Sequence, residues 1–379
     1  MEETGNGTEP FIPGHHEAEI CCGGEADLHK HYNSCKKNPG HVNFIPVNDF
    51  NLDHLPSPYH DVIVLEQIKA LSALTVLIKV KYTSLERPES APCFSGQYPF
   101  YNTRGSDVLR TGTGRVWRVA KYTESDKLGT CPCDKCKHSD TPNKMWGEVC
   151  VVTATHVVFD DSEVKQTMCV VGFDDNKSPG VKLEGWDVRW AIIESDFCEF
   201  TCVSCDLELL DELDKMLQHF KDLCKKVKDK YGTVDDVDKM AIIVSHPHGC
   251  PKQVSVGRWT HQHERSTYTC ICPGSIGAWV YMPGYDKWCA GPHCDGEYSE
   301  KGSWVYDPPV TVGSLHISNE TVDSLPLSNV TVGSLPMSNE TVDSLPFSNV
   351  TVSSLPLSNV TVCSLPLSNV NKQNGGSLH

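Results

Sequence analysis

Short β-rich runs fill the middle of this chain, and they restrict its fold more than any other feature. They lie between residues 62 and 310 and include LTVLIKVKY, GEVCVVTATHVVF, DVRWAII, MAIIVS, KQVSVGRW and GAWVYM. Gly, Pro, Asp and Ser separate these runs, as expected of strands that are joined by turns. Many short strands without regular helices between them are typical of barrels and sandwiches. The sequence therefore predicts an all-β domain.

One segment within this region departs from the strand pattern. In DLELLDELDKMLQHFKDLCKKVKDKYG, apolar residues recur every three or four positions, at Leu210, Leu213, Leu217, Phe220, Cys224 and Val227. This spacing places them on one face of an amphipathic helix. We therefore expect a helix over about 206–229 that connects two sets of strands.

The first 61 residues have a different composition, rich in His, Cys, Asn, Pro and Gly and with little hydrophobic periodicity. We expect an extension (1–61) with little regular structure. Its side chains of metal-binding type are His15, His16, Cys21, Cys22, His29, His31 and Cys35. No pair among them has the compact spacing of a zinc finger, so the pattern favours a polar tail over a metal site.

The C-terminal part is repetitive. Six near-identical ten-residue repeats, such as TVDSLPLSNV, fill residues 311–370, and residues 371–379 follow. Five of the six copies contain Pro, and Ser, Thr and Asn are frequent, which favours a disordered tail. Leu or Val also recurs every five residues, so a stacked β-solenoid is the alternative.

Charge and hydropathy limit the classes of partner. The formal charge is −16, from 33 Lys and Arg against 49 Asp and Glu, which disfavours nucleic acid and anionic membranes. No secretory signal is recognised at the N-terminus, and Glu66 and Lys69 interrupt the most apolar stretch (62–80). We expect a cytoplasmic protein whose 19 cysteines, an odd number, are mostly reduced. The sequence does not predict the oligomeric state.

A compact group of metal-binding side chains occurs in CPCDKCKH, at Cys131, Cys133, Cys136 and His138. Three thiols and one imidazole match the ligands of a structural zinc site, in which four protein ligands leave no open position. A reduced, solvent-facing loop is the alternative. Elsewhere, the two histidines of SHPHG (245–249) have no obvious third partner. Cys202 and Cys205 of TCVSCD are expected to be buried thiols beside the connecting helix.

Two segments carry a resemblance to a known family. VVTATHVVFDD places His156 just after an apolar strand, and CPGSIGAWV (272–280) supplies a glycine-containing turn that leads into another strand. Together with the strand–helix–strand arrangement between them, these segments resemble the chymotrypsin/trypsin-like serine peptidases over about 62–310. The resemblance implies a trypsin-like double β-barrel with an inter-barrel helix, and a catalytic triad in the cleft between the barrels.

The matching motifs imply roles for individual residues. TATH is similar to the T-A-A-H of the family, which would make His156 the general base. The 274–277 loop is similar to G-x-S-G, with the backbone amides of Gly274 and Ile276 as the oxyanion hole.

Two aspartates are candidates for the acid that orients the base. Asp196 in SDFCEF and Asp187 in WDVRWAII each precede an apolar run. Asp196 is preferred, because its distance along the chain from His156 is closer to the spacing in the family.

The loop departs from the family at its centre. Ile276 stands where the nucleophilic serine is expected, Ser275 falls one residue early, and Trp279 stands where Pro is usual. Isoleucine has no proton to give and no lone pair with which to attack. We therefore expect a pseudoprotease that retains peptide or protein binding, with no cofactor required for catalysis. The alternatives are an active serine endopeptidase that uses Ser275 in a shifted loop, and a structural protein that acts through its repeats.

Overall fold

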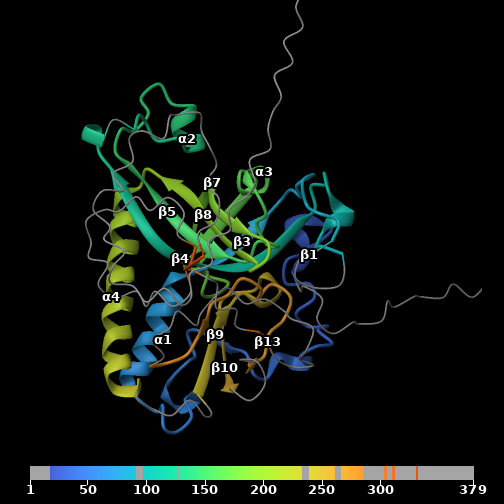
Figure 1. Cartoon of the computed structure of the whole chain (residues 1–379), viewed down its shortest axis with the longest axis vertical. Coiled ribbons are helices and arrows are strands. Elements are labelled where there is room, and N and C mark those ends of the chain that lie inside the picture. Colours follow the sequence, from blue (N-terminus) through green and yellow to red (C-terminus); the bar gives the residue numbers. More distant parts are fainter. Residues whose placement is uncertain are drawn as a thin grey trace, which may run out of the picture. The chain divides into compact units, whose positions relative to one another are not determined.

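The computed structural model describes residues 18–90, 97–126, 128–232, 239–260, 266–284, 303–304, 310–311 and 330–331. The chain divides into two compact units, Met1–Asp307 and Pro308–His379. The described part of the first unit is mostly β with few helices (Figure 1). The all-β prediction therefore holds at the level of fold class.

A closed six-stranded barrel lies in the first unit. Its strands are β3 (Thr75–Val80), β4 (Leu109–Tyr122), β5 (Trp146–Thr153), β6 (Thr167–Val171), β7 (Val181–Ile192) and β8 (Phe197–Ser204). They pair in the order β4-β3-β6-β7-β8-β5, and β5 pairs again with β4. All these pairings are antiparallel. Closure depends on the long β4, whose first half pairs with β3 and whose second half pairs with β5.

A second sheet follows the barrel in the chain. Its strands are β2 (Ile45–Pro46), β9 (Lys239–Ser245), β10 (Gln253–Thr260), β11 (Ser266–Tyr268), β12 (Val280–Tyr281) and β13 (Ser303–Trp304). The described strands form the open path β12-β9-β10-β11-β13, with β2 also paired to β10. The second barrel therefore stays a prediction, because residues 285–302 lie outside the described part of the chain.

Two longer helices pack against each other and against the barrel (Figure 1). The connecting helix α4 (Leu207–Tyr231) begins where the Asp206 side chain accepts the backbone N–H of Leu209, and it buries its apolar stripe. Helix α1 (Val62–Leu74) begins at Asp61 in the same way and leads directly into β3. The shorter helices are α2 (Asp134–Lys137), α3 (Asp161–Val164), η4 (Tyr101–Thr103), η5 (Glu124–Asp126) and η6 (Pro247–Gly249).

The described part of the N-terminal segment is joined to both sheets. β1 (Glu19–Cys21) pairs with β4, and β2 pairs with β10. Its other elements are the short helices η1 (Gly24–Asp27), η2 (Pro39–His41) and η3 (Leu52–His54). Phe44 and Phe50 are buried. The described residues of this segment therefore pack as part of the first unit and are not a polar tail.

The second unit contains the repeats. β14 (Val310–Thr311) and β15 (Val330–Thr331) pair in parallel, with Val310 opposite Val330. The other residues of the repeats lie outside the described part of the chain, so the choice between a disordered tail and a solenoid stays open. Among the described residues of the whole chain, no helix has the length and apolar character needed to cross a membrane.

Candidate functional site

His156 and Asp196 lie in two turns at one end of the barrel. His156 follows β5, and Asp196 lies between β7 and β8; the turns meet because β5 pairs with β8. One Asp196 carboxylate oxygen accepts the backbone N–H of His156 at 2.9 Å, and the other lies 2.5 Å from the ring Nδ1. The second candidate acid, Asp187, instead has its carboxylate 4.0 Å from Arg189. Asp196 is therefore the aspartate that orients His156.

Little of this pair is exposed to solvent. The side chain of His156 is 0% exposed and that of Asp196 is 15% exposed. Tyr98 is also buried, and burial together with the nearby charge of Asp196 raises the pKa of its hydroxyl. The His156 ring is therefore enclosed by the residues that surround it.

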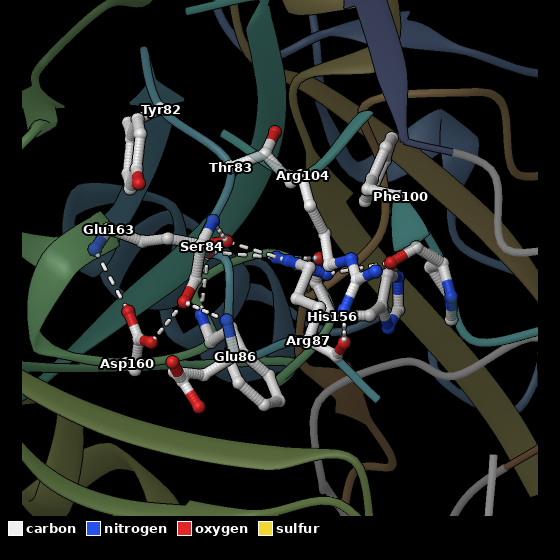
Figure 2. Close-up of polar contacts among 12 residues, drawn as sticks. Tyr82, Thr83, Ser84, Glu86, Arg87, Phe100, Arg104, His156, Asp160 and Glu163 are labelled. Carbon is white, nitrogen blue, oxygen red and sulfur yellow. Dashed lines mark hydrogen bonds and ion pairs between the residues drawn. The ribbon is translucent and has the colours of Figure 1, made fainter. Parts of the chain in front are cut away.

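A buried carboxylate fixes the backbone beside His156 (Figure 2). The carboxylate of Glu163, in α3, accepts hydrogen bonds from the Nε of Arg87 at 2.6 Å and from its Nη2 at 2.8 Å. The same Nη2 also donates to the His156 carbonyl at 3.1 Å. Arg110 also pairs with Glu163, and its Nε donates to the Val157 carbonyl at 3.2 Å. These three charged residues, which hold the histidine segment in place, have no recognisable motif in the sequence.

The electrostatics of this network favour the ionised form of the carboxyl. Burial of Glu163 alone would raise its pKa, but Arg110 and Arg87 outweigh that effect and hold the pKa below its usual value. The backbone N–H groups of Ser84 and Phe159 also donate to this carboxylate, at 2.9 and 2.8 Å. The carboxylate is therefore charged and fully hydrogen-bonded at neutral pH.

The 274–277 loop is clamped against the barrel. Thr113 on β4 donates from its N–H to the Ile276 carbonyl at 2.7 Å and from its hydroxyl to the Gly274 carbonyl at 2.8 Å. Gly277 has φ 84°, and a Cβ built there would lie 2.1 Å from the Thr153 hydroxyl oxygen. Only glycine fits at this position, because both the backbone conformation and the space exclude a side chain.

The loop and the histidine segment meet at β4. A Cβ built on Gly112 would lie 2.7 Å from the Val157 side chain and 3.2 Å from the Ile276 carbonyl oxygen. Val157 follows His156 directly. The two segments that carry the peptidase resemblance therefore lie at the same part of the barrel, although they are far apart in the sequence.

The two residues at the centre of the loop, Ser275 and Ile276, are both buried. Ile276 is fully buried within the main hydrophobic cluster, which also contains Val157 and Val158. Ser275 is fully buried too; its Oγ lies 3.0 Å from the Ser245 Oγ and 3.4 Å from the Cys272 backbone nitrogen. The serine hydroxyl is thus used in local hydrogen bonds, and apolar packing occupies the expected nucleophile position.

Trp279, the second departure from the family, also has a packing role. Its ring stacks on Trp117 of β4 with 5.7 Å between centroids, and the guanidinium of Arg115 lies 4.9 Å from its centroid. These contacts attach the strand that follows the loop to the barrel.

One group that could hold a metal contains three of the four residues that the sequence predicts. The sulfur atoms of this cysteine cluster lie within 4.8 Å of one another, and they belong to Cys131, Cys133, Cys136 and Cys205. The fourth predicted ligand, His138, is exposed and is not part of the cluster; its Nδ1 lies 2.8 Å from the Asp134 carbonyl oxygen. Cys205 takes that place because β8 returns beside the cysteine loop.

A second group that could hold a metal joins segments that are distant in the sequence. The ligand atoms of this Cys/His cluster also lie within 4.8 Å of one another, and they belong to Cys35, His41, His248 and Cys272. Cys35 and the SHPHG histidines are far apart in the sequence, and only the fold brings Cys35 and His248 together. Their spacing gives no signal, because three different loops supply the ligands.

No protein-family model matches the chain, and no curated protein matches it. The peptidase resemblance therefore depends on the motifs of this chain and on their geometry.

Proposed function

We propose that this chain is a non-hydrolysing protein with a trypsin-like double-barrel fold, which binds peptide or protein ligands without cleaving them. The burial of the side chains in the 274–277 loop is the observation that supports this proposal. Ile276 is packed in the core, and the Ser275 hydroxyl is buried against Ser245. Hydrolysis of a peptide by a serine enzyme needs a hydroxyl within reach of the base, and neither residue supplies one in this arrangement.

The retained His156–Asp196 pair has a structural role under this proposal. Asp196 accepts hydrogen bonds from His156, and the Asp196 carbonyl accepts the Thr155 N–H at 3.1 Å, so the pair links two barrel turns. Peptides or proteins are the favoured ligands, because the charge of −16 disfavours polyanionic partners. The alternative of an endopeptidase that uses Ser275 would require the loop to release that hydroxyl from Ser245.

Hydrolysis assays test the proposal. We expect the purified full-length chain to show no turnover of casein or of peptide esters above the buffer rate, and Ser275→Ala to change nothing. Turnover that Ser275→Ala abolishes would establish the endopeptidase alternative instead. Thr123→Ala, in the described residues far along the chain from this loop, is the matched control for removal of a hydroxyl.

We also propose that the cysteine cluster holds a structural zinc ion. Thiolates favour zinc, and four sulfur ligands in a compact group suit its tetrahedral geometry. The Sγ atoms of Cys133 and Cys205 lie 4.0 Å apart, close to the ~3.8 Å that Zn–S bonds of about 2.3 Å imply for two tetrahedral ligands. Such a site would fasten the loop around α2 to the end of β8, next to the start of α4.

A further inference from the structure

We propose that the Cys/His cluster, formed by Cys35, His41, His248 and Cys272, is a second structural zinc site. It would tether the N-terminal segment to the loop that leads into residues 274–277. This inference is independent of the peptidase-like function, because no step of it uses His156 or Ser275.

The geometry of the cluster suits a tetrahedral ion. The Sγ atoms of Cys35 and Cys272 lie 3.6 Å apart, and the Cys272 Sγ lies 3.3 Å from the Nε2 of His41. Tetrahedral zinc with ordinary bond lengths separates two sulfur ligands by about 3.8 Å and a sulfur from a nitrogen ligand by about 3.6 Å. The observed separations are therefore close to those that one bound zinc ion would impose.

A carboxylate orients the second histidine of the cluster. The Nδ1 of His248 lies 2.8 Å from the Glu19 carboxylate, so that Nε2 is the atom left to bind a metal. His248 is only 2% exposed, and among the described residues no hydrogen-bond partner lies at its Nε2. A buried nitrogen of this kind needs a partner, and a carboxylate behind the imidazole is the usual arrangement at zinc sites.

Asn38 supports the two sulfur ligands. Its backbone N–H donates to the Cys35 Sγ at 3.4 Å, and its side-chain amide donates to the Cys272 Sγ at 3.1 Å. Hydrogen-bond donors therefore point at both sulfurs, as they commonly do at metal-bound thiolates. Two thiolates and Zn²⁺ leave no net charge, so such a site can lie in this buried position.

The backbone at both histidines is unusual. His41 has φ 47° and His248 has φ 53°, which is the left-handed region that residues other than glycine rarely adopt. Strain of this kind persists where surrounding contacts or a bound group hold it. The left-handed turns direct the two rings to the same point, where they meet nearly at right angles with 5.2 Å between centroids.

Metal analysis of the unmodified chain tests the proposal first. We expect the full-length protein, expressed with added zinc and purified under reducing conditions, to contain two zinc ions per chain. X-ray absorption at the zinc edge would then give an average of three sulfur and one nitrogen ligand per zinc, from one Cys₄ and one Cys₂His₂ site. One zinc with four sulfur ligands would overturn the proposal and leave the cysteine cluster as the only zinc site.

Variants assign the second ion to its ligands. His248→Ala and Cys35→Ser are each expected to lower the zinc content from two to one, whereas Cys22→Ser is the matched control because Cys22 is exposed in the same segment. Zinc content that stays at two in both ligand variants would contradict the assignment. A Cys35–Cys272 disulfide in the purified protein, found by mass spectrometry of unreduced peptides, would also contradict it.

The role of Glu19 has a separate test. Glu19→Gln keeps the shape of the side chain but weakens its hold on His248, and loss of such a partner lowers metal affinity by about 10–100-fold. We expect competition with a chelator to show that loss for one of the two zinc ions. Glu25→Gln, in the same segment but paired at the surface with Lys79, should leave both affinities unchanged.

Discussion

At the scale of single residues, Ile276 has a packing role. Its side chain belongs to the same buried cluster as Val157, the neighbour of His156. A side chain that is part of the core contributes to stability, and a side chain in an open cleft does not. The free energy of unfolding therefore shows whether Ile276 packs in the core or lies in an open cleft.

Truncation of Ile276 should destabilise the fold. We expect Ile276→Ala to lower the free energy of unfolding by about 2–5 kcal/mol and Ile276→Val by about 1 kcal/mol, because each removes buried methyl groups and leaves a cavity. Urea unfolding of the full-length chain measures both values. Equal stability of all three proteins would show that the side chain is not packed as described.

Glu163 gives a prediction with a definite dependence on pH. Glu163→Gln leaves the buried Arg87 and Arg110 without a counter-charge, so we expect it to cost about 3–5 kcal/mol at pH 7. Because the pKa of Glu163 is lower in the folded than in the unfolded chain, its stabilisation is complete above about pH 4.5 and is lost as the pH falls through the folded value.

Thermal unfolding between pH 3 and pH 7 checks this dependence. The difference in melting temperature between the unmodified chain and Glu163→Gln should shrink below pH 4.5. Glu86→Gln is the control in the neighbouring loop. A difference that stays constant down to pH 3 would mean that Glu163 is not ionised in the folded chain.

At the scale of elements, the open question for the cysteine cluster is whether its fourth ligand comes from the same loop or from a distant strand. Cys205→Ser should remove one zinc ion per chain, whereas His138→Ala should remove none, because the fourth ligand comes from the end of β8 and not from the cysteine loop. Metal analysis of the two purified variants decides between them. The opposite result would restore the Cys₃His site that the sequence predicts.

Elements with a local signal could be predicted from the sequence. The α4 helix shows its apolar stripe at helical spacing, and the strands around His156 show β-rich runs between turn residues. The sequence does not predict the α1 helix, because residues 62–80 are mostly apolar apart from positions such as Glu66 and Lys69, and a helix and a strand that are buried on several sides have the same pattern. The cap residue Asp61 was the one local signal of its start.

Contacts between distant segments could not be predicted in this way. TATH and the 274–277 loop are recognised through a resemblance, whereas Glu163 in α3, Arg87 in a loop and Arg110 in β4 share no motif. The same is true of Cys35 and His248, which come together only because β1 and β2 attach the N-terminal segment to both sheets. Residue types alone indicate that a metal can bind, and the fold decides which ligands meet.

At the scale of the whole molecule, the first unit is rich in β-structure and contains a closed barrel. The closed barrel holds His156 and Asp196, and the N-terminal segment extends across both sheets. The two groups that could hold a metal bring together residues from loops that are distant in the sequence. Under the proposed function, the packing that stabilises the unit also prevents hydrolysis.

The most direct test is reaction of the full-length chain with a fluorophosphonate probe, followed by mass spectrometry of the labelled peptides. The probe reacts with an activated serine hydroxyl whether or not a substrate is known. We expect no adduct on Ser275 under conditions in which an active serine peptidase is fully labelled. An adduct on Ser275 that disappears in His156→Ala would contradict it.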